Sequence, residues 1–155
     1  MSRFRLSIVV LFAVCVLTLW VGTRMTSAFA AEGRSGELRV IKNCNDYTGQ
    51  AGSFCTIASS NLPEIVGARV FYDQAFGIPN PNPPGGMLDS NVLLYAGTGD
   101  WAVGRCTLDG NTGLGLCTFS DGVGKLAGFQ ARLAVAVASG ANNFSWDGRY
   151  HFDSN

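Results

Sequence analysis

The clearest strand pattern in the chain is NFSWDGRYHF, residues 143–152. Aromatic residues stand at positions 144, 146, 150 and 152, and polar residues stand at positions 145, 147, 149 and 151. Successive side chains of a strand point to opposite faces, so this segment has one apolar face and one polar face. The pattern predicts a β-strand that packs one face against a core.

Seven further runs of this kind precede it, each bounded by clusters of Gly, Pro, Asn or Asp. No stretch of the remaining chain keeps a helical apolar period for more than two turns without a glycine. The longest segment between runs, Gly77 to Ser90, holds all but one of the five prolines, so we expect a surface loop there, able to act as a lid. The seven runs cover approximately residues 37–42, 53–60, 67–76, 91–97, 101–109, 114–120 and 128–138.

Eight short strands joined by tight connections predict an all-β protein, and we favour a single antiparallel up-and-down barrel. Such a barrel removes exposed strand edges by closing on itself. A two-sheet β-sandwich shows the same alternation and the same spacing of turns, so it stays as the alternative.

The first 30 residues have the pattern of a secretory signal peptide. Arg3 and Arg5 precede a mostly apolar run, Leu6 to Gly22, and Ala28 and Ala30 have the spacing of a signal peptidase site. We expect cleavage after Ala30, which leaves residues 31–155 as one domain, secreted or periplasmic. A retained membrane anchor is the alternative.

Cleavage changes the charge of the protein. The chain has 11 basic and 11 acidic residues, and the first 30 residues contain three of the basic ones and no acidic ones, which leaves a net charge of −3. A mildly acidic domain without basic clusters argues against binding to nucleic acid or to anionic membranes.

Four cysteines remain after cleavage, an even number suited to an oxidising compartment. Cys44 and Cys55 are 11 residues apart, as are Cys106 and Cys117, and a turn signal at residues 109–113 separates the second pair. We favour these two local disulfides among the three possible connectivities. A metal site needs closer cysteines or several histidines. Because His151 is the one histidine, we expect no metal.

Two segments carry a resemblance to a known family. The first is GLGLCTFSDGVGKLAGFQARL, residues 113–133, in which a glycine turn at 121–124 separates two strands. The second is the terminal segment at 143–152. Over about residues 44–152 the chain resembles the allene oxide cyclase and dirigent superfamily, and in particular small secreted bacterial proteins with an allene-oxide-cyclase-like barrel.

The resemblance implies an eight-stranded barrel with a mostly apolar lumen, assembled as a trimer in many plant members. The plant cyclases confine an unstable fatty-acid epoxide while its ring closes, and dirigent proteins steer the coupling of phenoxy radicals or a quinone methide ring closure. Neither group uses a metal or an organic cofactor, so we expect none here. Such catalysis depends on fixing the geometry of a reactive substrate.

The resemblance also suggests site residues. Arg132, in Ala131-Arg132-Leu133, matches two residues of an Ala-Arg-Gly tripeptide of dirigent proteins and is our candidate for a cation in the pocket. Asp73 and Asp89 are the candidate carboxylates. Each of the three has a plainer interpretation as a solvent-facing, ion-paired or turn residue. The aromatic candidates for a ligand cavity, or alternatively for core packing, are Tyr72, Tyr95, Trp101 and Trp146.

We therefore expect a secreted barrel that binds a small hydrophobic molecule and guides its cyclisation or isomerisation without a cofactor, while whether it turns over a substrate at all stays open. The alternative is a non-catalytic extracellular module with a structural or protein-binding role. An eight-stranded barrel is wide enough to be filled by side chains or to hold one small ligand. The contents of the lumen therefore separate the two hypotheses.

Overall fold

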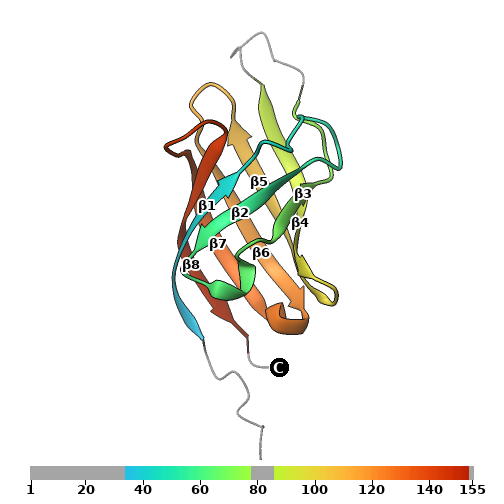
Figure 1. The fold of residues 1–155 in the computed structure, drawn as a ribbon, viewed down its shortest axis with the longest axis vertical. Helices are drawn as coiled ribbons and strands as arrows, with labels where there is room; N and C mark the ends of the chain where they lie inside the picture. The colour runs from blue at the N-terminus through green and yellow to red at the C-terminus, as the bar shows by residue number, and fades with distance from the viewer. Residues whose placement is uncertain (1–33, 78–85, 154–155) are drawn as a thin grey trace, which may run out of the picture. The chain divides into compact units, whose positions relative to one another are not determined.

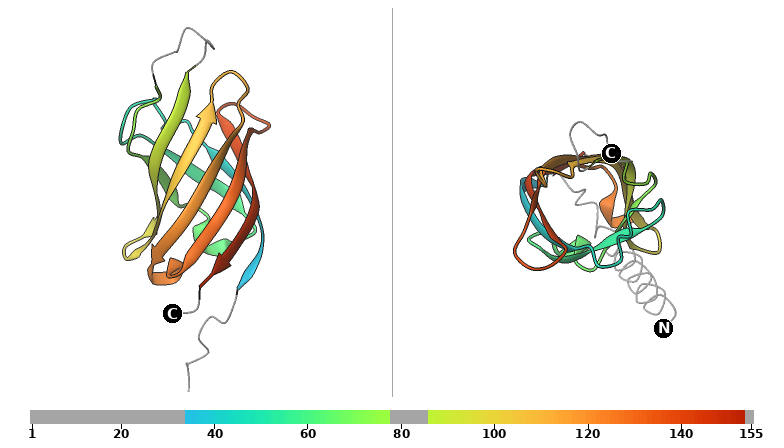
Figure 2. Two further views of the ribbon diagram at one scale, coloured as in Figure 1. Left: turned by 180° about the vertical axis from the view of Figure 1, so that it is seen from behind. Right: turned by 90° about the horizontal axis from the view of Figure 1, so that it is seen from above.

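The structure is a computed structural model that describes residues 34–77 and 86–153. Eight antiparallel strands form one closed barrel in which each strand pairs with its neighbours in sequence and β1 pairs with β8 (Figures 1 and 2). The strands are β1 (Ser35–Asn43), β2 (Phe54–Ser60), β3 (Arg69–Tyr72), β4 (Met87–Gly97), β5 (Asp100–Asp109), β6 (Gly115–Val123), β7 (Phe129–Val137) and β8 (Asn143–Phe152).

The predicted up-and-down barrel is confirmed, and the sandwich alternative is wrong. Two boundaries need correction. The strand expected at 67–76 covers only Arg69–Tyr72, and β4 begins at Met87, so the expected loop from Gly77 to Ser90 ends earlier. The four prolines of this segment lie at positions 79–84, and the alternating residues after them are free to pair with β5. Residues 78–85 of the expected loop and lid, and the signal segment, lie outside the described residues.

Alternating side chains fill the lumen. On β7, Phe129, Ala131, Leu133 and Val135 are buried while Arg132 and Ala134, between them, are exposed. The same alternation on every strand gives one continuous core, as expected for a small barrel. Among the described residues, no helix is both long and apolar enough to cross a membrane.

The two ends of the barrel differ. At one end β2 is followed by a short 3-10 helix, η1 (Pro63–Ile65), and β6 is followed by another, η2 (Gly124–Leu126) (Figure 1). Gly124 adopts a φ of 65°, which favours glycine and turns the chain into η2. Leu62, Ile65 and Leu126 are buried beneath these turns, so we call this end the plugged end.

At the opposite end, β1, β3, β5 and β7 finish and β2, β4, β6 and β8 begin. This end contains both disulfides, Cys44–Cys55 and Cys106–Cys117, which confirms the favoured pairing. Cys106 and Cys117 are direct partners in the β5–β6 register. We call it the cavity end, for the feature described next.

Candidate functional site

A partly enclosed cavity of about 50 Å³ lies inside the cavity end of the barrel. A buried space of roughly 10–15 Å³ on the same measure holds one water molecule, so this one has room for a group of a few non-hydrogen atoms. Its walls are mainly apolar and include the four disulfide-bonded cysteines. The lining residues are Lys42, Cys44, Tyr47, Cys55, Tyr72, Leu88, Cys106, Thr107, Leu108, Cys117, Val135 and Phe144.

Lys42 is the unusual member of this lining. It lies on β1 two residues after Val40, and because strand side chains alternate, it shares the lumen face with Leu38, Val40 and Cys44. Its side chain is only 4% exposed, although lysines are rarely buried without a charged partner. Strand register thus places an amine where the rest of the strand places core residues.

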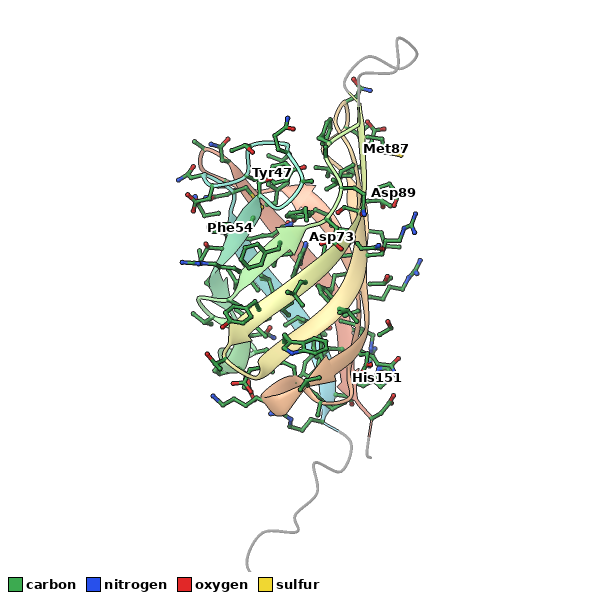
Figure 3. The ribbon with its side chains drawn as sticks, turned by 90° about the vertical axis from the view of Figure 1, so that its right-hand side faces the viewer. Tyr47, Phe54, Asp73, Met87, Asp89 and His151 are labelled. Carbon is green, nitrogen blue, oxygen red and sulfur yellow. A yellow bond between two sulfur atoms is a disulfide. The ribbon has the colours of Figure 1, made fainter. Side chains whose placement is uncertain are left out.

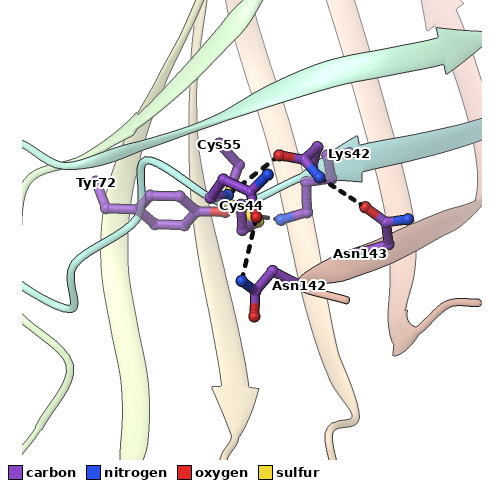
Figure 4. The surroundings of a disulfide bond; sticks show 8 residues. Lys42, Cys44, Cys55, Tyr72, Asn142 and Asn143 are labelled. Carbon is purple, nitrogen blue, oxygen red and sulfur yellow. Dashed lines mark hydrogen bonds between the residues drawn. A yellow bond between two sulfur atoms is a disulfide. The ribbon is translucent and has the colours of Figure 1, made fainter. Parts of the chain in front are cut away.

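One hydrogen bond holds the Lys42 amine. Nζ donates to the hydroxyl oxygen of Tyr72, on β3, at 2.7 Å (Figure 4). Nζ also lies 4.6 Å from the ring centre of Trp146, within the range of a cation–π contact. No carboxylate among the described residues forms an ion pair with Lys42. An amine in this position has hydrogen-bonding capacity to spare.

Burial changes the acidity of the groups in the cavity. Removal from water disfavours the ammonium form and lowers the pKa of Lys42 to about 7. The same effect raises the pKa of Tyr72, with a smaller contribution from Tyr47, so the Tyr72 hydroxyl keeps its proton at neutral pH. Near neutral pH the cavity therefore contains both protonation states of the amine beside a neutral phenol.

Tyr47 adds a second polar group to the cavity wall. It follows β1, and its ring packs edge-on against the Tyr72 ring with centroids 5.0 Å apart. Its hydroxyl is buried and has no hydrogen-bond partner among the described residues. Burial also raises the pKa of Tyr47. An unpaired buried hydroxyl is costly, so this atom is suited to a partner that enters the cavity.

Trp146 separates the cavity from the plugged end. Its ring faces Lys42 on one side and packs against Phe119, with centroids 5.5 Å apart, on the other. Beyond it, Phe119, Phe129, Tyr150 and Phe152 form a chain of aromatic contacts. All of these rings belong to the buried core or pack against it.

Two of the aromatic candidates face the lumen, but only Tyr72 is among the residues that line the cavity, whereas Trp146 packs in the core. Tyr72 lines the cavity and Trp146 is buried in the lumen against Lys42. Tyr95 and Trp101 instead face outward, as register partners of each other on β4 and β5. Their neighbours in sequence, Leu94 and Ala102, occupy the lumen positions.

The three charged candidates all lie outside the lumen. Arg132 is exposed on β7, because the buried Ala131 and Leu133 take the inward positions. Asp73 is exposed just after β3, and Asp89 is on the outer face of β4 (Figure 3). Asp89 accepts two hydrogen bonds from Arg105, at 2.7 and 2.6 Å, and this contact lowers the pKa of the Asp89 carboxyl.

The expectation that Arg132 supplies a cation inside the barrel is therefore wrong. The basic side chain in the lumen is that of Lys42. Resemblance to the dirigent tripeptide suggested Arg132, but the alternation of side chains along β7 turns that residue outward. The signal for Lys42 was present in its own strand, as a lysine in phase with Leu38 and Val40.

No group of three or more His, Cys, Asp or Glu side chains suited to a metal ion occurs in the described part of the chain. Comparison of the chain with known proteins found no matching family model, no similar curated protein and no similar solved structure.

Proposed function

We propose that this protein binds a small apolar molecule whose polar head enters the cavity and is held by Lys42 and Tyr72. The observation that carries the proposal is a buried amine in an apolar cavity with a single hydrogen-bond partner. Core positions of small barrels are normally apolar, and a buried lysine costs stability. A group retained at such a cost is well placed to recognise a ligand.

The chemistry of the cavity defines the head group. Nζ of Lys42 donates hydrogen bonds in either protonation state, and the Tyr47 hydroxyl has no partner among the described residues. Both suit a ligand oxygen, such as that of a carbonyl, carboxylate, alcohol or phenol. The apolar walls, with Leu88, Val135 and Phe144 among them, suit the carbon atoms attached to that oxygen.

The size of the cavity defines how much of the ligand enters. About 50 Å³ accommodates a head group of a few atoms, not a whole fatty acid. Very small ligands gain at most about 1.5 kcal/mol for each non-hydrogen atom, so we expect weak to moderate affinity unless further atoms bind outside the cavity.

We place this binding outside the cytoplasm. Two disulfides fit an oxidising compartment, and the first 30 residues have the pattern of a signal peptide. The closed eight-stranded barrel is the fold that the resemblance to allene-oxide-cyclase-like and dirigent proteins implies. Confinement of a reactive ligand in the cavity would be the corresponding route to catalysis without a cofactor.

The test is a ligand titration followed by NMR spectroscopy of the purified protein. The panel comprises phenol, cyclohexanol, propanoate and decanoate, which share an apolar body and one oxygen function. We expect saturable shifts at Lys42, Tyr72 and Val135 for at least one compound. No saturable shift with any compound, or shifts confined to the outer face, would overturn the proposal.

Two adjacent substitutions on β7 provide a matched control. Val135→Phe fills the cavity from the lumen side and should abolish binding, whereas Ala134→Phe adds the same ring to the outer face and should leave binding unchanged. Circular dichroism would check that each variant is folded. Equal binding by both variants would place the ligand elsewhere.

A second candidate function, an interaction module, is favoured by an apolar patch on the outside of the barrel. Tyr95, Val103 and Val123 are exposed on β4, β5 and β6, and Trp101 lies between Tyr95 and Val123 in the register. A second copy of the chain, as in the trimers that the resemblance implies, is the partner to test first. Analytical ultracentrifugation of the protein and of a Val103→Glu/Val123→Glu variant tests this. If copies associate through this patch, the variant should sediment with a lower mass than the wild-type protein.

A further inference from the structure

We infer that Lys42 is a nucleophile that forms an imine with an aldehyde bound in the cavity. This inference rests on the proposed function and narrows the ligand class from oxygen-containing molecules in general to reactive carbonyl compounds. A lysine amine attacks a carbonyl carbon only when it is uncharged and when its lone pair can reach the substrate. The cavity meets both requirements.

The surroundings of Lys42 favour the uncharged amine. Nζ is buried, and within the described part of the chain no carboxylate or guanidinium group lines the cavity. The titratable side chains that face it are Tyr72, from β3, and Tyr47, from the segment after β1. The four cysteines in the lining are bonded as disulfides and do not titrate.

These buried surroundings determine the protonation state of the Lys42 amine. An ordinary exposed lysine is almost wholly protonated at neutral pH. The pKa of Lys42, lowered by burial to about 7, leaves a large fraction of this amine unprotonated under the same conditions. Desolvation of a lysine in an apolar pocket is a known way to activate it as a nucleophile.

The reaction balances without any other reagent. The Nζ lone pair forms a bond to the aldehyde carbon, and a proton moves from nitrogen to the former carbonyl oxygen to give a carbinolamine. Loss of that hydroxyl group with the second amine proton releases water and leaves a C=N bond. Addition of water reverses both steps.

Tyr72 is placed to assist the proton transfers. Its hydroxyl oxygen lies 2.7 Å from Nζ, so it is within hydrogen-bond reach of the atom that loses protons. Burial raises the pKa of Tyr72, so the hydroxyl has a proton to donate at neutral pH. We assign it the role of proton relay.

The chain contains an internal control for this chemistry. Its only lysines are Lys42 and Lys125. Lys125 lies in η2 at the plugged end, its side chain is 73% exposed, and its Nζ is 3.4 Å from an oxygen of Asp100. One protein therefore presents one buried and one exposed lysine to the same reagent.

The experiment traps the imine by reduction. The purified protein is incubated with propanal and sodium cyanoborohydride, which transfers hydride to the C=N bond and fixes the adduct as a secondary amine. Mass spectrometry of peptides then measures labelling at Lys42, at Lys125 and at the N-terminal amine. Each adduct adds the mass of the aldehyde less one oxygen atom.

At pH 7 we expect at least tenfold more label at Lys42 than at Lys125, with the ratio falling as the pH rises towards 10. Lys42→Met should remove that label, Lys125→Arg should not, and Tyr72→Phe should slow labelling at Lys42. Equal labelling of the two lysines, or label confined to Lys125 and the N-terminal amine, would overturn the inference.

A parallel titration separates this inference from the proposed function. Propan-1-ol has the same carbon chain as propanal and an oxygen in the same place, but it cannot form an imine. Saturable binding of propan-1-ol without trapping of propanal refutes the imine and leaves the binding function intact. Absence of both binding and trapping refutes the two together.

Discussion

The two ends of this barrel are built from the same strands, but their lumens are filled in different ways. At the plugged end, two 3-10 turns insert Ile65 and Leu126 between the strands, and a chain of aromatic rings fills the lumen behind them. At the cavity end no such turn enters among the described residues, and a lysine, two tyrosines and two disulfides surround an open space.

The difference shows how one small core divides between a closely packed part and a part with a polar cavity. Close packing without polar groups stabilises the plugged end by burial of apolar area. At the cavity end, the side chains that border the empty space lack packing contacts on that side, and the buried amine lowers the stability of the fold. The disulfides lie at this weaker end, where covalent links offset what packing does not supply.

A matched pair of leucine substitutions tests this division most strongly. Leu126→Ala removes a fully buried side chain from η2, and we expect it to lower the free energy of unfolding by about 4 kcal/mol. Leu88→Ala enlarges a space that already exists, and we expect a loss of about 2 kcal/mol. Urea denaturation measures both. Equal losses would show that the ends are packed alike.

Removal of either disulfide should have the next largest effect. Each closes a segment of the same length, since both pairs are 11 residues apart, so the chain-entropy model predicts a loss of about 3 kcal/mol for each. Thermal unfolding of Cys44→Ala/Cys55→Ala and of Cys106→Ala/Cys117→Ala measures the two losses. Ligand binding should weaken in both variants, because both bridges line the cavity; unchanged binding would contradict that role.

Replacement of Lys42 by methionine should change stability with a sign that depends on pH. Below pH 7 the native protein buries an ammonium ion, so Lys42→Met should stabilise it by about 2 kcal/mol, net of the lost Tyr72 hydrogen bond.

Between pH 7 and 10.5 the unfolded chain binds a proton at residue 42 that the native protein has released. Wild-type stability from this group therefore rises with pH, and the advantage of the variant should shrink and then reverse. Chemical denaturation at pH 6, 8 and 9.5 checks this trend. Lys125→Met is the exposed control and should show no such crossing; a difference that does not vary with pH would argue against a neutral buried amine.

The smallest effect should come from Arg132. Its side chain is exposed on the outer face of β7, so Arg132→Ala should change stability by no more than about 0.5 kcal/mol and leave ligand binding as it is. The same urea denaturation and NMR titration measure it. Weaker binding in this variant would indicate that Arg132 contributes to the binding site.

Most of the fold could be predicted from the sequence because period-two alternation is a direct consequence of strand geometry. All eight strands occur close to their expected positions, and the error at β4 arose because a proline-rich segment masked the alternating residues that follow it. Closure into a barrel was predicted because it removes the two exposed edge strands that an open sheet of this size would have.

The site was harder to predict, because its residues come together only through the register of strands distant in sequence. Tyr72 and Lys42 are 30 residues apart, and their contact depends on the β1–β2 and β2–β3 pairings. The outward candidates, Tyr95 and Trp101, show that residue type alone does not indicate the face. Counting alternate residues from Leu38 would have placed Lys42 in the lumen.

The pairing of β1 with β8 has a consequence for how the barrel forms. Seven of the pairings join strands that follow each other in sequence, but this one aligns nine residue pairs across a separation of about 100 residues, as between Asn43 and Asn143. Such a contact has the highest loop-closure cost in the molecule, so we expect the hairpins to form first and the ring to close last. In its geometry, though, this pairing is an antiparallel ladder like the other seven. A circular permutant that joined residue 153 to residue 34 and opened the β4–β5 turn would turn the β1–β8 contact into an ordinary hairpin, and the pairing of β4 with β5 should then be the last to form.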